Sequence, residues 1–134
     1  MRIIIKAIFF FSASLVILSV SACDRKADDT LASRITGKWQ WERTVIPYGG
    51  QTSDPGTAGY TWALEFSPHG IMKEFRNDSI VLTTNYWIED DSADPELFVL
   101  IYDGYSYHCS ISGDKLEFKE AYVDGPVIFF NRIR

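Results

Sequence analysis

From Gly37 onward, the chain alternates short runs of aromatic and β-branched residues with clusters of Gly, Pro, Asp and Asn. These clusters favour turns, because their residues tolerate a positive φ or preset a bend. Connections this short make consecutive strands antiparallel neighbours. No later segment has the length and period of a substantial helix, which argues against a parallel α/β fold. The pattern predicts eight strands: Lys38 to Ile46, Tyr60 to Phe66, Ile71 to Arg76, Ile80 to Ile88, Leu97 to Tyr102, Tyr105 to Ile111, Leu116 to Tyr122 and Val127 to Ile133.

Alternation of apolar and polar residues supports these strands. Tyr60, Trp62, Leu64 and Phe66, for example, fall on one face of their strand. Eight short antiparallel strands in a single domain can close into a barrel or pack as a sandwich, and closure removes exposed edges. We therefore predict an all-β fold, an antiparallel eight-stranded up-and-down barrel, in preference to a sandwich or an incomplete barrel.

The N-terminus has the layout of a secretory signal peptide. Arg2 and Lys6 precede a 14-residue apolar stretch, residues 7–20, and small residues follow it. A membrane-spanning helix is the alternative, but crossing the hydrocarbon takes about 20 apolar residues, and Lys6 interrupts this run early. We therefore predict a signal peptide over residues 1–22.

The end of that segment, Val20-Ser21-Ala22-Cys23, resembles the lipobox of bacterial lipoproteins. The resemblance implies that the thiol of Cys23 carries diacylglycerol, that the chain is cut before it, and that the new N-terminus is acylated with a chain such as palmitate. An ordinary cysteine beyond an ordinary cleavage site is the alternative. Two or three acyl chains suffice for stable anchoring, since each buried methylene contributes about 0.8 kcal/mol.

Cleavage after residue 22 would leave 112 of the 134 residues, the size of one domain. Residues 23–34 are then the lipidated cysteine and a polar tether, and residues 35–134 are the barrel domain. The mature chain would keep 11 basic and 18 acidic residues, a net charge near −7. This charge disfavours nucleic acid as a partner, and it disfavours adhesion of the domain itself to anionic lipid.

Motifs for catalysis and cofactor binding are missing from the sequence. It contains no zinc signature, no nucleophile elbow and no phosphate-binding glycine loop. The acidic segment 89–96 has neither the glycine nor the bidentate glutamate of a calcium loop, so it reads as a solvated turn. We therefore predict no catalytic residues, no metal site and no cofactor, and do not expect an enzyme.

The second cysteine, Cys109, has no partner for an intrachain disulfide once Cys23 carries lipid. Its apolar neighbours favour a buried, inert thiol over a reactive one. The adjacent His108 points to the opposite face of the predicted strand, so the two side chains cannot bind one metal ion together.

Thr30, Ser79 and Ser92 each follow an aspartate and precede an apolar residue. These tripeptides resemble the O-glycosylation motif of Bacteroidetes. Whether any of the three hydroxyls is glycosylated stays open at the level of sequence.

Several short motifs are spread over the predicted domain: Gly37-Lys38-Trp39, Glu65-Phe66 followed by Gly70, the run Ile111 to Leu116, and the run Phe129 to Ile133. Through them the chain resembles the small lipocalin-like lipoproteins of Bacteroidetes and, more loosely, lipocalin and calycin barrels. The resemblance covers essentially the whole mature domain and implies a lipocalin-like fold.

The resemblance also assigns two structural residues. It implies that Trp39 closes the base of the barrel and that Arg132, from the last strand, lies across its ring as a cation on an aromatic face. Arg134 lies on the same strand face and is the alternative partner. Either pair would be a structural plug of the barrel.

A long first loop folding over the barrel mouth is a further implication, and Pro47 to Gly59 is in that place. The sequence is compatible with two interpretations of this segment, a functional lid and an irregular surface loop. An eight-stranded barrel is either filled by its side chains or just wide enough for one small ligand. The many heavy aromatics favour a filled interior.

Two functional hypotheses follow. The first is a lipid-anchored cell-envelope domain that binds a small ligand, for which an apolar molecule is one candidate, or a glycan or a peptide. The alternative is a non-enzymatic structural or accessory lipoprotein, whose filled barrel docks on an envelope protein complex or acts as an inhibitor. The membrane would be a partner through Cys23 in both cases. Asp24 and the acidic residues that follow fit both inner-membrane and surface-export signals, and the resemblance favours the outer membrane.

Overall fold

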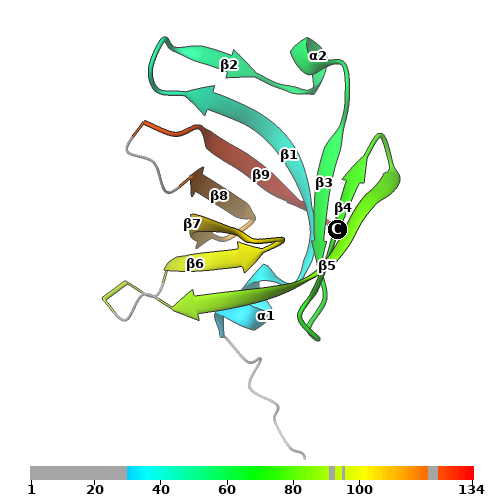
Figure 1. Ribbon diagram of the computed structural model, residues 1–134, viewed down its shortest axis with the longest axis vertical. Helices are drawn as coiled ribbons and strands as arrows, with labels where there is room; N and C mark the ends of the chain where they lie inside the picture. The colour runs from blue at the N-terminus through cyan, green and yellow to red at the C-terminus, as the bar shows by residue number, and fades with distance from the viewer. Residues whose placement is uncertain (1–29, 91–92, 95, 121–123) are drawn as a thin grey trace, which may run out of the picture.

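The computed structural model describes residues 30–134, apart from residues 91–92, 95 and 121–123. The described chain is built mainly of antiparallel strands (Figure 1). Its elements are α1 (Leu31–Ile35), β1 (Gly37–Ile46), β2 (Gln51–Ser53), α2 (Pro55–Ala58), β3 (Trp62–Phe66), β4 (Ile71–Arg76), β5 (Ser79–Asp90), β6 (Leu97–Tyr102), β7 (Tyr105–Ser112), β8 (Lys115–Glu120) and β9 (Val127–Ile133).

The strands form a closed, up-and-down barrel. Each of β3 to β8 pairs with the next strand in the chain, β1 pairs with β3, and β9 returns to pair with β1. The closing pairs include Trp39 opposite Arg132 and Trp41 opposite Phe130, and the register shifts between Trp41 and Arg43. The predicted all-β, eight-stranded antiparallel barrel is confirmed, and this architecture fits a lipocalin-like fold.

Two of the tight hairpins show why the sequence turns where it does. Asn77 and Asp78, between β4 and β5, have φ of 48° and 64°. Asp103 and Gly104, between β6 and β7, have φ of 50° and 79°. Two consecutive positive φ values match the right-handed twist of antiparallel strands, and Asn, Asp and Gly adopt them at the lowest cost.

The segment between the first two barrel strands is more ordered than an irregular loop. It contains β2, which pairs with the end of β1, and α2. In α2 the Asp54 carboxylate accepts from the Thr57 backbone N–H at 2.8 Å, and the Thr57 hydroxyl accepts from the Asp54 N–H at 2.9 Å. This capping box, with Pro55 in the first turn, starts a short helix that sequence periodicity could not reveal. The structure therefore has a ninth strand outside the eight of the barrel.

Strand bounds differ from the predicted ones mainly at their ends. The strand expected from Tyr60 begins at Trp62, and β5 is longer at both ends than the predicted Ile80 to Ile88. The predicted end of the strand at Tyr122 lies outside the described residues.

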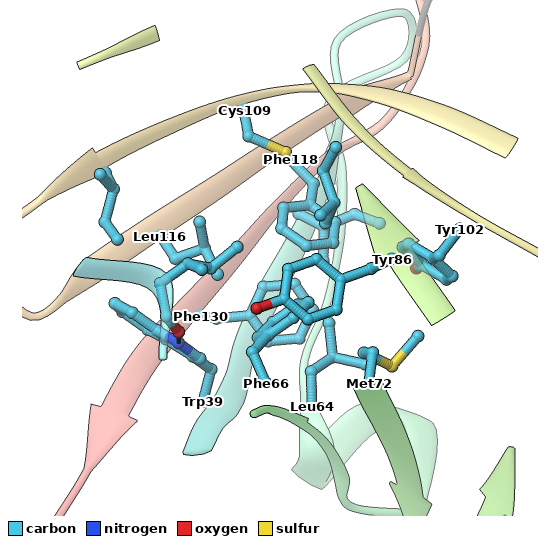
Figure 2. Close-up of a cluster of buried hydrophobic side chains, with 14 of the residues drawn as sticks. Trp39, Leu64, Phe66, Met72, Tyr86, Tyr102, Cys109, Leu116, Phe118 and Phe130 are labelled. Atoms are coloured by element: carbon cyan, nitrogen blue, oxygen red, sulfur yellow. Dashed lines mark hydrogen bonds between the residues drawn. The ribbon is translucent and has the colours of Figure 1, made fainter. Parts of the chain in front are cut away.

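The core fills one half of the barrel. Ten large side chains are less than 2 % exposed: Trp39, Phe66, Phe118, Phe130, Ile35, Leu64, Met72, Leu100, Ile111 and Leu116. Figure 2 shows Phe66, Leu64 and Phe130 packed between Trp39 on one side and Tyr86 and Tyr102 on the other. Ile35 belongs to the same cluster, so α1 covers this end of the barrel. An interior packed to this extent leaves no room for an elongated apolar ligand in this half.

Candidate functional site

At the covered end, the guanidinium of Arg132 lies 4.2 Å from the centre of the Trp39 ring. Trp39 is fully buried, and its indole N–H donates to the Ile35 carbonyl at 2.7 Å. Arg132 donates through Nη1 to the Thr36 carbonyl at 2.7 Å and through Nη2 to the Arg34 carbonyl. The two side chains thus join β1 and β9 to the end of α1.

The alternative partner, Arg134, lies elsewhere. Its side chain is 86 % exposed, and its Nη2 contacts the Asp114 carboxylate at 3.3 Å. The arginine that stacks on the tryptophan is therefore Arg132.

Gly37 precedes this stack for a steric reason. Its φ is +119°, a region that residues with a side chain rarely adopt, and a Cβ placed there would lie 3.1 Å from Arg132 Nη1. The Gly37-Lys38-Trp39 motif therefore combines a backbone position for glycine with the buried ring that Arg132 covers.

At the opposite end, side chains that point into the barrel reach solvent. Strand register places Trp62 opposite Arg76, Leu64 opposite Glu74, and Leu100 opposite Tyr107. Leu64 and Leu100 are fully buried, so their neighbours across the ladder share the inner face. Trp62, Glu74, Arg76 and Tyr107 are nevertheless only partly buried, because they lie nearer to the open end.

We call this open end the cup and define it by the inward side chains that surround it. The cup residues are Trp62, Glu74, Arg76, Tyr102, Tyr107 and Glu120, with Tyr60 at the rim.

Arg76 is held firmly inside the cup. Its guanidinium carbon lies 4.3 Å from the centre of the Trp62 ring and 4.8 Å from that of Tyr60. Its Nε donates to Glu74 Oε1 at 3.0 Å, and the side chains of Glu74 and Arg76 are 16 % and 34 % exposed. Two rings and a carboxylate fix the orientation of the guanidinium, while within the described residues its two Nη groups have no hydrogen-bond partner.

The indole of Trp62 adds an unused donor. Its Nε1 is buried and has no hydrogen-bond partner among the residues that the structure describes. The other two inner tryptophans differ, because the Trp39 indole donates to Ile35 and the Trp41 indole donates to the Thr44 hydroxyl at 3.0 Å. A buried donor without a partner carries a cost that a bound acceptor would relieve.

Two tyrosines complete the wall of the cup. The rings of Tyr102 and Tyr107 stack with centres 5.3 Å apart. Burial, followed by the neighbouring Tyr107 and the charge of Glu74, raises the pKa of Tyr102. Burial also raises the pKa of Tyr107, so both hydroxyls stay protonated near neutral pH.

The β2–α2 segment borders the cup. In Figure 1, β2 and α2 lie at the end of β1 that is opposite α1. Ala58 of α2 packs against the core cluster, and the ring of Tyr60 stacks on Trp41 at 5.5 Å with an interplanar angle of 16°. The β2–α2 segment therefore forms one side of the rim of the cup.

A separate hollow of about 320 Å³ lies on the outer wall, where β7, β8, β9 and β1 run side by side. It is lined by outward side chains such as Ser110, Lys115 and Phe129. Glu42, at the irregularity in β1, binds Lys115 at 3.2 Å and Asn131 at 3.0 Å there. Burial raises the pKa of Glu42, but these bonds and the charges of Lys115 and Arg43 outweigh it and lower the pKa overall.

The remaining residues that the sequence singled out are dispersed. Cys23 and Ser92 lie outside the described residues. Thr30 caps α1, its hydroxyl accepting from the Ser33 N–H at 3.3 Å, and Ser79 is exposed at the start of β5. Cys109 is 2 % exposed, and burial raises the pKa of its thiol well above the usual range.

Across the described part of the chain, no three His, Cys, Asp or Glu side chains gather closely enough to hold a metal ion. No helix in those ranges is long and apolar enough to cross a membrane.

Sequence reasoning did not find Glu74 and Arg76. They alternate with Lys73 and Phe75 near the end of a strand, where charged residues ordinarily face solvent. The available signal was their spacing from Met72, because residues two apart share a face and Met72 is buried.

The chain was compared with models of known protein families and with curated proteins, and neither comparison found a match.

Proposed function

We propose that this chain is a lipid-anchored cell-envelope protein of the lipocalin-like type, whose cup binds a ligand. Cys23 would carry the lipid, residues 23–34 would comprise this cysteine and the polar tether, and the barrel would project from the membrane, with the outer membrane favoured. The proposal includes no enzymatic step, no metal and no cofactor.

The observation that carries this proposal is the set of hydrogen-bonding groups left unused on the inner wall of the cup. The Arg76 Nη groups and the buried Trp62 indole N–H belong to inward side chains near the open end and have no hydrogen-bond partner within the described ranges. Inward polar groups lower the stability of a barrel core, so a structural role alone does not account for them. Convergent polar groups on an aromatic wall are typical of ligand sites.

The accessory role remains the second candidate, because the outer wall also exposes apolar side chains. Val81, Trp87 and Leu97 are 56 %, 60 % and 42 % exposed on β5 and β6. Together with the filled half of the barrel next to α1, these exposed apolar side chains would suit docking on an envelope protein.

Native mass spectrometry of the mature, detergent-solubilised protein, after incubation with cell-envelope extract, tests the two candidates. We expect a small molecule to stay bound to the wild-type protein and to be lost from Trp62→Ala. A variant on the outer wall, Trp87→Ala, should retain it. Recovery of a protein partner alone, displaced by Trp87→Ala, would refute ligand binding and support docking.

The anchor has its own test. Growth with an alkyne-labelled fatty acid should label the wild-type protein and leave Cys23→Ser unlabelled and released from the membrane fraction. Equal labelling of both proteins would overturn the lipidation proposal.

A further inference from the structure

We propose that the hollow of about 320 Å³ on the outer wall is a second binding site, which takes a small molecule with one carboxylate on an apolar body. Arg43 and Lys115 hold the carboxylate, and Phe129 contacts the apolar body. The site is separate from the cup, so this inference goes beyond the proposed function and does not depend on it.

A β-bulge in β1 builds one side of this hollow. Trp41 pairs with Phe130 and Arg43 pairs with Phe129, so Glu42 between them has no partner in the ladder. In a regular strand Glu42 and Arg43 would point to opposite faces, but here both line the hollow on the outer wall. Bulges re-aim side chains in this way and are common next to functional sites.

Short side chains on β7 leave the space itself. The strands β1, β9, β8 and β7 follow one another in Figure 1, and their register places Arg43, Phe129, Glu117 and Ser110 in one row across the outer wall. Ser110 and Ser112 are the smallest side chains of the lining. The resulting volume is at the low end of the about 300–1,000 Å³ that is typical of small-molecule sites.

Two cations lie together beside the bulge. Nη1 of Arg43 donates to Oε1 of Glu42 at 2.7 Å, and Nζ of Lys115 donates to Oε2 at 3.2 Å. Since both bind one carboxylate, Arg43 and Lys115 are close to each other. Their side chains are 43 % and 68 % exposed, so a ligand can reach them. Exposed ion pairs are weak, and Glu42 therefore does not prevent the two cations from sharing a second carboxylate.

Several hydrogen-bond donors of the hollow are unused. Within the described residues, Nε and Nη2 of Arg43 have no hydrogen-bond partner, and these two groups form one edge of the guanidinium. Such an edge matches a carboxylate, which accepts two parallel bonds from it. The hydroxyls of Ser110 and Ser112 are also without a partner in the described part of the chain.

The charge around the hollow favours a ligand with one negative charge. Three basic side chains, Arg43, Lys115 and Lys119, and two acidic ones, Glu42 and Glu117, face it and the adjoining hollow, a net charge of +1. This wall is positive although the whole chain carries −5. Glu117 is itself paired with Lys119 at 3.1 Å. A monoanion neutralises the wall, whereas a dianion reverses its sign and a cation adds to it.

The apolar body of the ligand has a place beside these charges. Phe129 lines the hollow and is only half-buried, although the Arg43 guanidinium lies 4.4 Å from the centre of its ring. A smaller hollow of about 50 Å³ shares Ser110 and Glu117 with the first and reaches Leu97, which is 42 % exposed. Contact with this carbon surface adds affinity that a free inorganic anion cannot gain.

The test uses amide NMR spectra of the full mature protein in a polyoxyethylene detergent, because a charged detergent would itself be an amphiphilic ion. Phenylpropionate, phenylpropionamide and phenylpropylamine are matched probes, which share one body and differ in the charge of the head group. Phenyl phosphate supplies a dianion. We expect phenylpropionate to bind most tightly, with shifts centred on the amides of Ser110, Ser112 and Phe129.

Matched variants locate the site. Arg43→Gln should weaken binding of phenylpropionate by about tenfold, and Lys115→Gln should weaken it less, since Lys115 is more exposed. Ser110→Leu keeps every charge but fills the hollow, so it should abolish binding. Arg134→Gln removes the same charge away from the lining, and Ser106→Leu adds the same bulk at an exposed position of β7, so both should bind as the wild type does. Unchanged circular dichroism spectra separate loss of binding from loss of folding.

The opposite results would overturn the inference. Tighter binding of the amine, the amide or phenyl phosphate would contradict a site for a single carboxylate. An equal loss of affinity in Arg134→Gln would reduce the effect to general attraction by charge. Binding that survives Ser110→Leu would place the ligand elsewhere, and no shift with phenylpropionate up to its solubility limit would refute the site, while the proposed function of the cup would stand in each case.

Discussion

Replacing Arg132 by glutamine should destabilise the barrel by about 4 kcal/mol, as the sum of one aromatic stack and two hydrogen bonds. The stack on Trp39, at 4.2 Å in a largely buried place, contributes about 1 kcal/mol. The two bonds to the Thr36 and Arg34 carbonyls are charge-assisted, and each contributes about 1.5 kcal/mol, at the low end for such bonds because the side chain keeps 22 % exposure. The contact with Asp114 adds little, since that carboxylate is about half exposed.

Urea unfolding at neutral pH, followed by circular dichroism and by tryptophan fluorescence, measures this loss. Arg134→Gln is the matched control, because Arg134 directly follows the same strand, is 86 % exposed and makes one 3.3 Å contact. Its free energy of unfolding should stay within about 0.5 kcal/mol of the wild type.

A double-mutant cycle then isolates the stack itself. Combining Arg132→Gln with Trp39→Leu should give a coupling energy of about 1 kcal/mol between the two side chains. If Arg132→Gln costs no more than Arg134→Gln, or if the coupling is zero, the assignment of this pair as the plug of the barrel is wrong.

Three further predictions concern Gly37, Cys109 and Glu42. Gly37→Ala should lower the free energy of unfolding by about 1–3 kcal/mol, because its φ of +119° and the nearby Arg132 both oppose a side chain. Urea unfolding should show a larger loss than for Gly113→Ala, where the added Cβ would meet no atom within 4 Å. Cys109 should not react with Ellman's reagent at pH 8 until the protein is unfolded, since burial raises the pKa of its thiol; rapid reaction of the native protein would contradict this. Glu42→Gln should lower the free energy of unfolding by less than about 1 kcal/mol at pH 7. Because the folded pKa of Glu42 lies below 4.5, the loss measured by urea unfolding should shrink as the pH falls from that value through the folded pKa. A loss that is independent of pH would exclude the ion pairs as its source.

Barrel topology could be predicted because its determinants are local. Asp103 and Gly104 supply the positive φ values of a two-residue turn, and Asn77 and Asp78 do the same one hairpin earlier. Alternation in the Trp62–Phe66 strand then determines which face is buried. Once each strand is joined to the next by a short turn, closure of the first strand on the last is the remaining way to remove the edges.

The site was predicted only in part, because its residues interact across the barrel. The Trp39 and Arg132 pair was expected from resemblance, and the structure places the two side chains in contact. The inward direction of Glu74 and Arg76 was not expected, because a charged residue at a strand end ordinarily faces water. The helix α2 was missed because four residues are too few to show a helical period.

Sequence alone determined the eight barrel strands, their turns and the all-β class, since each depends on residues that are adjacent in the chain, and the anchor at Cys23 stays a prediction from the sequence. Tertiary structure decided which end of the barrel is filled, which arginine covers Trp39, and that Arg76 lies between two rings and a carboxylate inside the cup. These features depend on strand tilt, register and the β-bulges in β1 and between β4 and β5, which set how far each inward side chain lies from solvent. Spacing along one strand carries no information about how far an inward side chain lies from solvent. That distance is determined only when all eight strands close around a common core.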